Sequence, residues 1–226
     1  MSVVITEVGP SIAELARKAG GAPEPGVVLG IPNTGRLYEE GLLLTGCHES
    51  TPARERSLLH DAGGFVVVNA RSNDLPHLLA HGVVDLVLTG RDYVVESGVR
   101  AEELWDFGFQ RCRVCLLGPA SAADWRERPN LRVATQYPGI AADFLKQHRP
   151  DSELFTVTGA AELYARLGLA DVIIDAYMTG RTAAANGLVP LETVLETSGR
   201  LFARPSWRNE SKDIDRVLAR LVGDTR

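Results

Sequence analysis

The sequence contains little cysteine, and it has no apolar run long enough to cross a membrane. Its three cysteines, Cys47, Cys112 and Cys115, are an odd and sparse set. Cys112 and Cys115 have the spacing of a zinc or redox pair, but no second pair of Cys or His completes a metal site. Both lie in an apolar run that is typical of a buried strand. No signal peptide is recognisable, so we expect a cytoplasmic protein that does not bind membranes.

Two nucleotide-binding motifs are also missing. The sequence has no Gly-x-x-x-x-Gly-Lys-[Ser/Thr] motif, which excludes a Walker P-loop, and no Gly-x-Gly-x-x-Gly motif, which argues against a dinucleotide fold. The formal net charge of −5 and the isoelectric point near 5.6 argue against nucleic acid as a partner. A local group of arginines can still bind small anions on an acidic protein.

The composition of the chain is typical of a globular enzyme. Hydrophobic residues make up 45% of its 226 residues and charged residues 23%, which is enough for one large or two small domains with buried cores. An amphipathic stretch at residues 12–19 is followed by a Gly/Pro-rich connector at residues 20–26.

Short apolar runs alternate with segments of helical periodicity from residue 27 onward. We predict strands at 27–31, 65–68, 83–88, 113–117, 131–134, 154–157 and 172–174, and helices at 36–44, 75–81, 140–148, 160–168 and 211–222. This alternation predicts an α/β fold with mostly parallel strands. Loops at the carboxyl ends of such strands carry the chemistry, and the loops at 32–36, 89–92 and 175–182 fit that description.

The last of these loops is the most informative. Asp175 ends an apolar strand and is suited to accept hydrogen bonds from ribose hydroxyls. Gly180 allows the backbone to approach an anion, and the hydroxyls of Thr179 and Thr182 are donors. The small residues at 183–185 would begin a helix whose N–H groups face the same anion. The pattern fits a ribose 5-phosphate, but it also fits a plain strand–turn–helix junction in which Thr182 caps the helix.

Several segments together resemble a known family. The matching segments, in order along the chain, are Arg71–Pro76, Asp85–Asp92, Val133–Pro138, Gly159–Glu162, Gly168–Asp171, Asp175–Leu188 and Glu196–Leu201. Their order and spacing resemble those of ATP phosphoribosyltransferase, the first enzyme of histidine biosynthesis. The resemblance runs from about Val27 to the C-terminus.

The resemblance implies a fold and an assembly. The expected fold is α/β and two-lobed, like a type II periplasmic binding protein, with the active site in the interlobe cleft. Residues 1–26 would be an N-terminal extension, 27–98 plus 182–226 lobe one, and 99–181 lobe two. The chain resembles the short form of the family, which lacks a C-terminal regulatory domain. Short forms work with a regulatory subunit that resembles histidyl-tRNA synthetase, which implies a homo- or hetero-oligomer.

The resemblance also implies a reaction. The family joins phosphoribosyl pyrophosphate to ATP at an adenine ring nitrogen and releases pyrophosphate with the help of Mg²⁺. Because the transition state resembles an oxocarbenium ion, catalysis depends on positioning and charge stabilisation and needs no covalent nucleophile. The resemblance gives catalytic roles to Asp175, Arg36 and Glu162. It gives substrate-binding roles to Arg71, Asp74, Thr89, Gly90, Arg91, Asp92, Thr179, Gly180, Arg181 and Thr182. We expect no protein metal ligand.

Two lysines of the family pattern are missing. Asn33 and Thr34 stand where the family has a lysine in Pro-Lys-Gly-Arg-Leu, with one residue extra, and Gln136 replaces the lysine of Ala-Thr-Lys-Tyr-Pro. Each lysine would place a point charge near polyphosphate, and Arg181 can restore one of them. Three functions remain open: ATP phosphoribosyltransferase, a paralogue that transfers phosphoribosyl to a different acceptor in specialised metabolism, and a non-catalytic small-anion-binding homologue.

Some of the matching residues also fit purely structural roles or a different class of protein. Arg71 and Asp74 could form a structural ion pair, and Arg91 with Asp92 could merely close a turn. A solute-binding module would not need a Thr-Gly-Arg-Thr loop after an acidic strand end. A type I phosphoribosyltransferase usually has two adjacent acids there, whereas Ala176 follows Asp175 in this chain.

Overall fold

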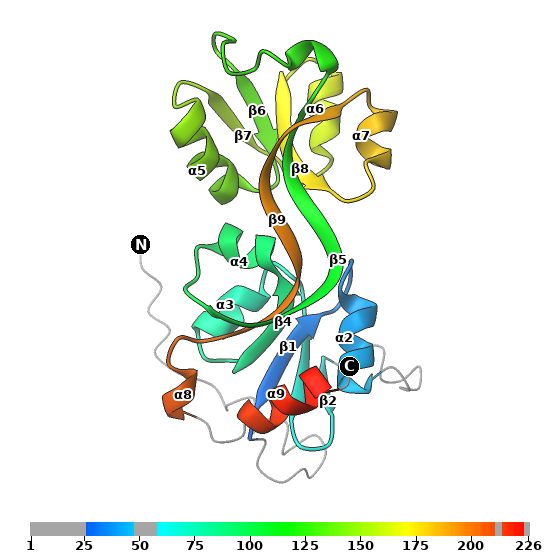
Figure 1. Ribbon diagram of the computed structural model, residues 1–226, viewed down its shortest axis with the longest axis vertical. Helices are drawn as coiled ribbons and strands as arrows, with labels where there is room; N and C mark the ends of the chain where they lie inside the picture. The colour runs from blue at the N-terminus through cyan, green and yellow to red at the C-terminus, as the bar shows by residue number, and fades with distance from the viewer. Residues whose placement is uncertain (1–25, 48–57, 211–213, 224–226) are drawn as a thin grey trace. The chain divides into compact units, whose positions relative to one another are not determined.

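The computed structural model describes residues 26–47, 58–210 and 214–223 (Figure 1). The amphipathic stretch expected at 12–19 and all but the last residue of the 1–26 extension lie outside these residues. No helix within the described residues is long and apolar enough to cross a membrane.

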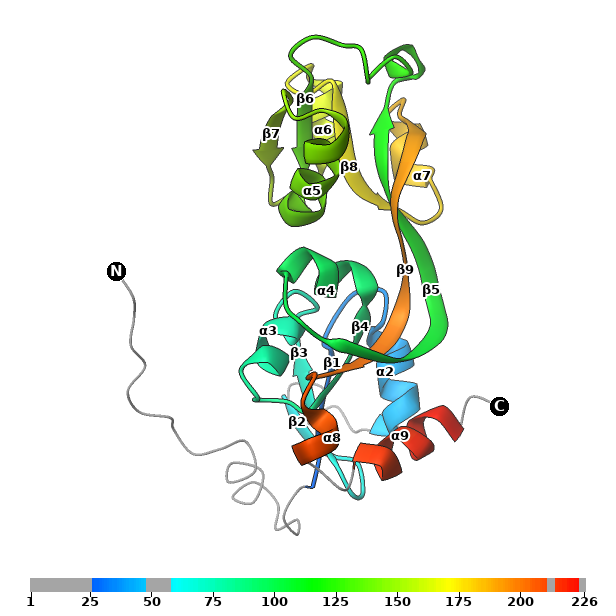
Figure 2. The same cartoon turned by 60° about the vertical axis from the view of Figure 1, so that its left-hand side comes forward.

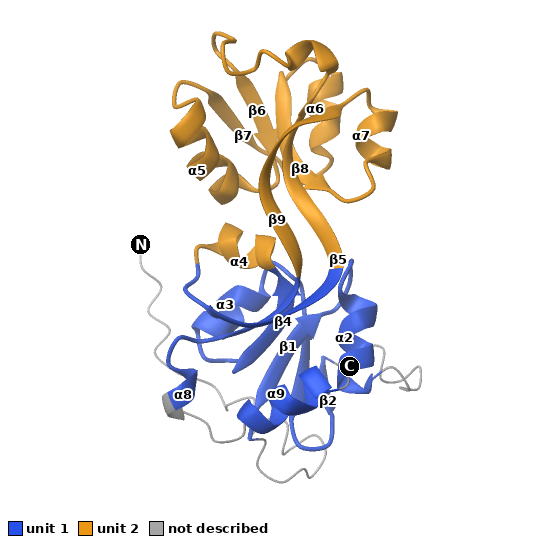
Figure 3. Cartoon of the chain, viewed as in Figure 1, with its two compact units in different colours: residues 1–90, 99–109, 199–226 blue, residues 91–98, 110–198 orange. Residues whose placement is uncertain are grey.

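The chain forms two compact units (Figure 3). Unit 1 comprises residues 1–90, 99–109 and 199–226, and unit 2 comprises residues 91–98 and 110–198. These units divide the chain differently from the expected lobes, since residues 91–98 and 182–198 fall in unit 2 and residues 99–109 fall in unit 1. The reason is that two long strands, β5 (Glu102–Gly118) and β9 (Val189–Ala203), each contribute residues to both units.

Unit 1 is built on five strands in the order β2-β3-β1-β4-β9. The strands are β1 (Val28–Pro32), β2 (Leu59–Asp61), β3 (Val66–Ala70), β4 (Leu86–Gly90) and the end of β9. β1 pairs in parallel with β3 and β4, whereas β2 and β9 are antiparallel to their neighbours. This confirms the three strands predicted here but adds β2 and β9.

The helices of unit 1 cover both faces of its sheet (Figure 2). They are α2 (Tyr38–Thr45), α3 (Leu75–Ala80), α8 (Trp207–Glu210) and α9 (Ile214–Gly223). α9 buries Ile214, Val217 and Leu221 against the apolar side chains of β1 and β4. The amphipathic C-terminal helix predicted from its apolar spacing is therefore confirmed over residues 214–222.

Unit 2 has the strand order β9-β5-β8-β6-β7. Its three parallel strands are β6 (Arg132–Thr135), β7 (Glu153–Thr156) and β8 (Val172–Tyr177), and β5 is antiparallel to β8. Its helices are α4 (Arg91–Ser97), α5 (Pro138–His148), α6 (Ala161–Arg166) and α7 (Arg181–Ala185), with a 3₁₀ turn at Ala120–Ala122.

Helices pack on both faces of the unit 2 sheet, α5 on one face and α6 and α7 on the other (Figure 1). Val172 and Ile174 pack with α5 in one core cluster, and Ile173 packs with α6 and α7 in another. Burial on both faces explains why β8 reads as an uninterrupted apolar run rather than as an alternating pattern. Cys112 and Cys115 are buried free thiols in β5, as expected.

One expected loop is not a loop. Thr89 and Gly90 are the last residues of β4, and Arg91 and Asp92 begin α4 directly. The helix follows the strand without a connector, so the Thr-Gly-Arg-Asp sequence marks a strand–helix junction. The prediction of a loop at 89–92 was therefore wrong.

Candidate active site

The carboxyl ends of β6 and β8 lie side by side in unit 2. Thr135 and Ile174 are register partners, and the Thr135 hydroxyl donates to the Ile174 carbonyl at 2.7 Å. The same hydroxyl accepts the Tyr137 N–H at 2.8 Å, which fixes the chain as it leaves β6. Gln136, the first residue after β6, and Asp175, the next residue of β8, therefore lie beside each other.

Asp175 is a buried carboxyl at this strand end, with only 7% of its surface exposed. Its Oδ1 atom accepts the N–H of Ala176 at 2.7 Å. Burial and, to a smaller extent, the negative charge of nearby Glu162 raise the pKa of Asp175 to about 6, although the Ala176 N–H and the Gln136 side chain act in the opposite direction. Asp175 therefore changes its protonation state close to neutral pH.

The loop after β8 turns sharply at Gly180. This residue is the N-cap of α7 with φ +72°, and a Cβ atom added to it would lie 2.4 Å from the Tyr177 hydroxyl oxygen. Both the left-handed backbone and this contact require glycine. The side chains of Thr179, Arg181 and Thr182 are exposed. The N-cap Gly180 has no side chain to cap α7, and the Thr179 hydroxyl oxygen accepts the Arg181 N–H at 3.5 Å. The alternative in which Thr182 caps α7 is therefore wrong, because Gly180 is the N-cap and Thr182 lies inside the first turn.

The predicted catalytic acid Glu162 lies on α6, which packs against β8. It is half-buried in the first turn of the helix, and its charge acts on Asp175. The structure thus brings together Asp175, Glu162 and the loop at 179–182, all from unit 2.

Arg113 and Tyr177 were missed by sequence reasoning. They are register partners on β5 and β8, and the Arg113 guanidinium lies over the Tyr177 ring at 5.3 Å from its centre. Arg113 is exposed and donates to the Thr193 hydroxyl at 3.4 Å. Within the described part of the chain it forms no ion pair with a carboxylate. No local motif could reveal Arg113, because its contact with the strand that leads into the loop is made through Tyr177, which lies far away in the sequence.

Asp92 has a different environment from Asp175. Its side chain is fully buried, Oδ1 accepts the Thr197 hydroxyl at 2.7 Å, and Oδ2 accepts the Tyr137 hydroxyl at 3.3 Å. The Asp92 N–H also donates to Thr197 Oγ1 at 3.1 Å. These contacts tie α4 to β9 and to the segment after β6, which supports an anchoring role.

Glu96 anchors the other end of α4. Its carboxylate oxygens accept the N–H groups of Gly139 and Ile140, each at 2.9 Å, at the start of α5. A carboxylate at this position satisfies orphan donors and interacts favourably with the helix dipole. A Cβ atom at Gly139 would lie 2.9 Å from the Glu96 carbonyl oxygen, so the close approach requires glycine.

The remaining predicted residues lie at strand ends of unit 1, apart from half-buried Arg91 at the start of α4. Half-buried Arg36 lies between β1 and α2. Arg71 and Asp74 are exposed between β3 and α3, where the Asp74 N–H donates to the Arg71 carbonyl at 2.9 Å. Their side chains form no ion pair with each other in the described structure, so the alternative interpretation of Arg71 and Asp74 as a structural ion pair is wrong. Thr89 is fully buried, and its hydroxyl has no hydrogen-bond partner among the described residues.

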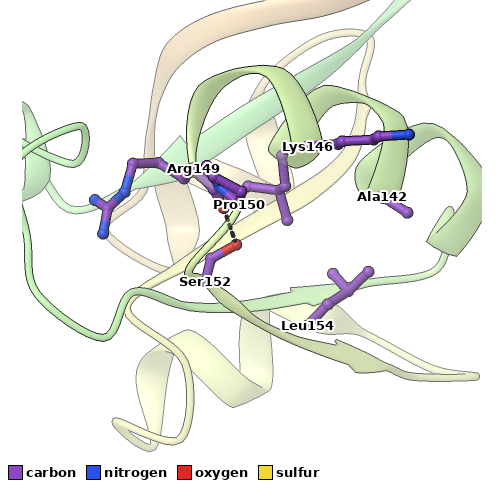
Figure 4. A pocket seen from close by; sticks show the side chains of 7 residues that line it. Ala142, Lys146, Arg149, Pro150, Ser152 and Leu154 are labelled. Atoms are coloured by element: carbon purple, nitrogen blue, oxygen red, sulfur yellow. Dashed lines mark hydrogen bonds between the residues drawn. The ribbon is translucent and has the colours of Figure 1, made fainter.

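A pocket of about 200 Å³ lies at the other end of the unit 2 strands (Figure 4). It is lined by Ala142, Leu145, Lys146, Arg149, Pro150, Ser152 and Leu154. The Arg149 guanidinium is occupied by Asp151 and by the Trp125 carbonyl. The pocket lies where β7 begins, whereas Gln136 and Asp175 lie where β6 and β8 end, so it is no part of this site.

Comparisons with known proteins identify the family of the chain. The family model described as ATP phosphoribosyltransferase matches residues 71–223. ATP phosphoribosyltransferase of Metallosphaera sedula is 36% identical over 196 residues, which cover 84% of this chain and 68% of that protein. The enzyme of Aquifex aeolicus is 34% identical over 193 residues, covering 83% of this chain and 90% of that protein.

Solved structures give the same result. The ATP phosphoribosyl transferase (HisG:HisZ) complex from Thermotoga maritima matches with a TM-score of 0.77 and 26% identity, over 88% of this chain and 98% of that chain. The ancestral amino acid-binding protein AncCDT-1 matches with a TM-score of 0.58 and 15% identity, over 95% of this chain and 92% of that chain. The second match shows the fold alone and confirms the likeness to binding proteins. The matches in sequence and in structure together show that the chain belongs to the ATP phosphoribosyltransferase family.

Proposed function

We propose that Asp175 and the loop at 179–182 bind the ribose 5-phosphate of phosphoribosyl pyrophosphate, which the chain joins to ATP. This is the reaction of ATP phosphoribosyltransferase, the first step of histidine biosynthesis. The observation that carries the proposal is a buried carboxyl followed within a few residues by an exposed turn with a left-handed glycine.

The turn supplies the donors that a phosphate monoester requires. The N–H groups at the start of α7 have no partners within the helix, and Gly180 leaves the backbone uncovered. Thr179 and Thr182 add exposed hydroxyl donors, and Arg181 adds a positive charge. Because α7 has only five residues, these individual donors account for binding better than a helix dipole does.

The two carboxyls suit the sugar. Ionised Asp175 accepts hydrogen bonds from the ribose hydroxyls, and this fixes C1 relative to the phosphate. In the reaction the bond from C1 to the pyrophosphate oxygen breaks, and a bond from an adenine ring nitrogen to C1 forms. Glu162 is our candidate for stabilising the positive charge that develops on the sugar, and Arg36 for stabilising the departing pyrophosphate.

The other predicted contacts remain proposals. We assign Arg71, Asp74, Thr89, Gly90 and Arg91 to substrate binding, on the family resemblance of their segments. Asp92 acts in our proposal through the position of α4, because both its oxygens are occupied by hydroxyls.

We propose that Mg²⁺ reaches the site as the complex of the substrate diphosphate. No group of three or more His, Cys, Asp or Glu in the described residues is arranged to hold a metal ion. Mg²⁺ commonly keeps water ligands and binds through substrate phosphates, so such a complex does not require a cage of protein side chains.

A partner subunit also remains a proposal. The Thermotoga maritima relative was solved as a HisG:HisZ complex. By that likeness we propose that this chain assembles with a regulatory subunit or with further copies of itself. Its proposed substrates, ATP and phosphoribosyl pyrophosphate, support a cytoplasmic location.

The test is pyrophosphate release from phosphoribosyl pyrophosphate with a panel of acceptors, with and without the regulatory subunit. We expect turnover with ATP. Turnover with another base alone would select a paralogue with a different acceptor, for which the replacement of a family lysine by Gln136 is the relevant observation. Absence of phosphoribosyl pyrophosphate binding in calorimetry would overturn the proposal altogether.

A further inference from the structure

Tyr177 is the last residue of β8 and leads into the loop at 179–182. Its half-buried ring packs at the edge of the core cluster that contains Ile173 and Ala183. Because side chains alternate along a strand, Tyr177 projects from the same face of β8 as Asp175. The aromatic ring therefore shares its face of the sheet with the carboxyl that we assign to the ribose.

Two neighbours fix the position of the Tyr177 ring. The guanidinium carbon of Arg113, its register partner on β5, lies 5.3 Å from the ring centre. A cation over an aromatic face is attracted by the charge distribution of the ring. At the far end of the ring, a Cβ atom added to Gly180 would collide with the Tyr177 hydroxyl oxygen and with Cζ. The phenol group therefore lies directly against the turn, with its orientation set by contacts on two sides.

The Tyr177 hydroxyl has no hydrogen-bond partner among the described residues. The Tyr137 hydroxyl, by contrast, is buried and donates to Asp92 Oδ2 at 3.3 Å. The Tyr177 hydroxyl oxygen is also not enclosed by the described part of the chain. A phenol hydroxyl in this situation is a donor that a ligand at the turn can use.

We propose that Tyr177 is a further substrate-binding residue, whose hydroxyl donates a hydrogen bond to the 5-phosphate of the sugar at the Gly180 turn. The phosphate in this statement rests on the proposed function. The hydroxyl lies against Gly180, whose turn we assign to the phosphate, so the phosphate rather than the ribose is its partner. Hydrogen bonds to an ionised acceptor are stronger than those between neutral groups.

A purely structural role for Tyr177 would require the ring but not the hydroxyl. Phenylalanine would keep the stacking with Arg113 and the support of Gly180, because Cζ and Cε2 of the ring also lie close to this glycine. Leucine would remove both contacts. Tyr177→Phe and Tyr177→Leu therefore separate the hydroxyl from the ring.

The first test measures the affinities for ribose 5-phosphate and for phosphoribosyl pyrophosphate by calorimetry at pH 8, in the full chain. Tyr177→Phe should weaken both by about tenfold or more, because a hydrogen bond to a charged group is lost. Tyr177→Leu should weaken both further, because the turn also loses its support. The matched control is Tyr164→Phe, the same substitution at a half-buried tyrosine of α6 in the same core cluster, and it should leave both affinities unchanged.

Two results would overturn the proposal, provided that Tyr177→Phe keeps the near-UV circular dichroism of the parent. Parent affinities in Tyr177→Phe, together with a loss in Tyr177→Leu, would make Tyr177 a packing residue. A loss for phosphoribosyl pyrophosphate without a loss for ribose 5-phosphate would place the hydroxyl at the diphosphate instead.

The second test observes the phenol directly in the parent protein. The chain is labelled with ¹³C at Cζ of its five tyrosines, and the Tyr177 resonance is identified as the signal that both Tyr177 variants lack. Ribose 5-phosphate should shift this resonance and leave that of Tyr164 in place, whereas ribose at the same concentration should shift neither. A Tyr177 resonance that stays in place at saturating ribose 5-phosphate would also overturn the proposal.

The two proposals fail in different ways. If the parent binds neither ribose 5-phosphate nor phosphoribosyl pyrophosphate, the proposed function fails, and the role of Tyr177 fails with it. If the parent binds both ligands and Tyr177→Phe binds them equally well, the role of Tyr177 fails and the proposed function stands.

Discussion

Asp92, in the first turn of α4 after β4, and Asp175, near the carboxyl end of β8, are both buried aspartates, yet their carboxyls have opposite surroundings. Asp92 is completely buried, and both its oxygens accept hydroxyls from Thr197 and Tyr137. Asp175 retains slight exposure, accepts one backbone N–H and lies close to acidic Glu162. The Asp92 carboxyl has its hydrogen bonds within the fold, whereas the surroundings of Asp175 disfavour its charge. Asp92 therefore anchors the structure, and Asp175 is available to a ligand.

The largest effect on stability should follow removal of the Asp92 carboxyl. Asp92→Ala would leave the buried Thr197 and Tyr137 hydroxyls without their acceptor, so we expect the free energy of unfolding to fall by about 3 kcal/mol. Urea denaturation measures this loss. Asp74→Ala, which removes an exposed acid, is the matched control and should change stability by less than about 0.5 kcal/mol. Preserved stability with lost substrate binding would instead place Asp92 in the binding site.

Asp175→Asn should have the opposite sign. Because the pKa of Asp175 is raised from 3.8 to about 6, the folded chain binds this proton more tightly than the unfolded chain, and stability declines as pH rises between these values. Removing the charge should therefore stabilise the protein at pH 8 by about 2 kcal/mol, with no gain at pH 4.

The same variant should bind phosphoribosyl pyrophosphate more weakly at pH 8, by roughly 1.5–3 kcal/mol, because the ribose loses a charged acceptor. Thr179→Ala should weaken binding by a similar amount without the gain in stability. Thermal denaturation and calorimetry at both pH values check the pair. A loss of stability in Asp175→Asn at pH 8 would show that the Asp175 carboxylate stabilises the fold, as the Asp92 carboxylate does.

Gly180→Ala tests whether the turn, as well as the carboxyl, defines the β8 end. The left-handed φ and the contact with the Tyr177 hydroxyl should cost about 1–2 kcal/mol of stability and distort the phosphate donors. Gly187→Ala has a similar φ of +73° but no atom within 4 Å of the added Cβ. It should cost stability while keeping substrate affinity. Equal affinity losses in both variants would argue against a specific role for the turn at Gly180.

Arg113→Gln should give the smallest effect. The guanidinium is exposed, so its attraction for a nearby phosphate is screened, and we expect affinity to fall by about 0.5–1 kcal/mol at low salt and less at high salt. Arg126→Gln removes a guanidinium that lies over Trp125 and pairs with Glu192, away from the loop. It should leave affinity unchanged. A salt-independent loss in Arg113→Gln would favour a packing role through Tyr177.

Local pattern predicted much of this architecture. The apolar runs of β1, β3, β4, β6 and β8 lie in buried strands, and the loop at 179–182 lies at a strand end as expected. The pattern failed for β9 and the first part of β5, because many of their side chains are exposed and the apolar signal is weak. It also failed at α4, where Thr-Gly-Arg-Asp resembles a turn.

Partners far apart in the sequence could not be predicted in the same way. Asp92 meets Thr197 across 105 residues, and Arg113 meets Thr193 across 80. The chemistry of each residue type suggested that it could bind an anion or a hydroxyl. Strand pairing decides whether such a residue meets another side chain or remains available to a substrate.

The passage of β5 and β9 through both units has a consequence for synthesis of the chain. Most of unit 2 is one continuous segment, residues 110–198, whereas unit 1 also needs residues 199–226, which follow that segment in the sequence. Pairing of β9 with β4 and docking of α9 can occur only after those residues have been synthesised. Domains tend to form as units while the chain emerges from the ribosome. We therefore expect unit 2 to fold before unit 1, although unit 1 contains the strands β1, β3 and β4 that are synthesised first.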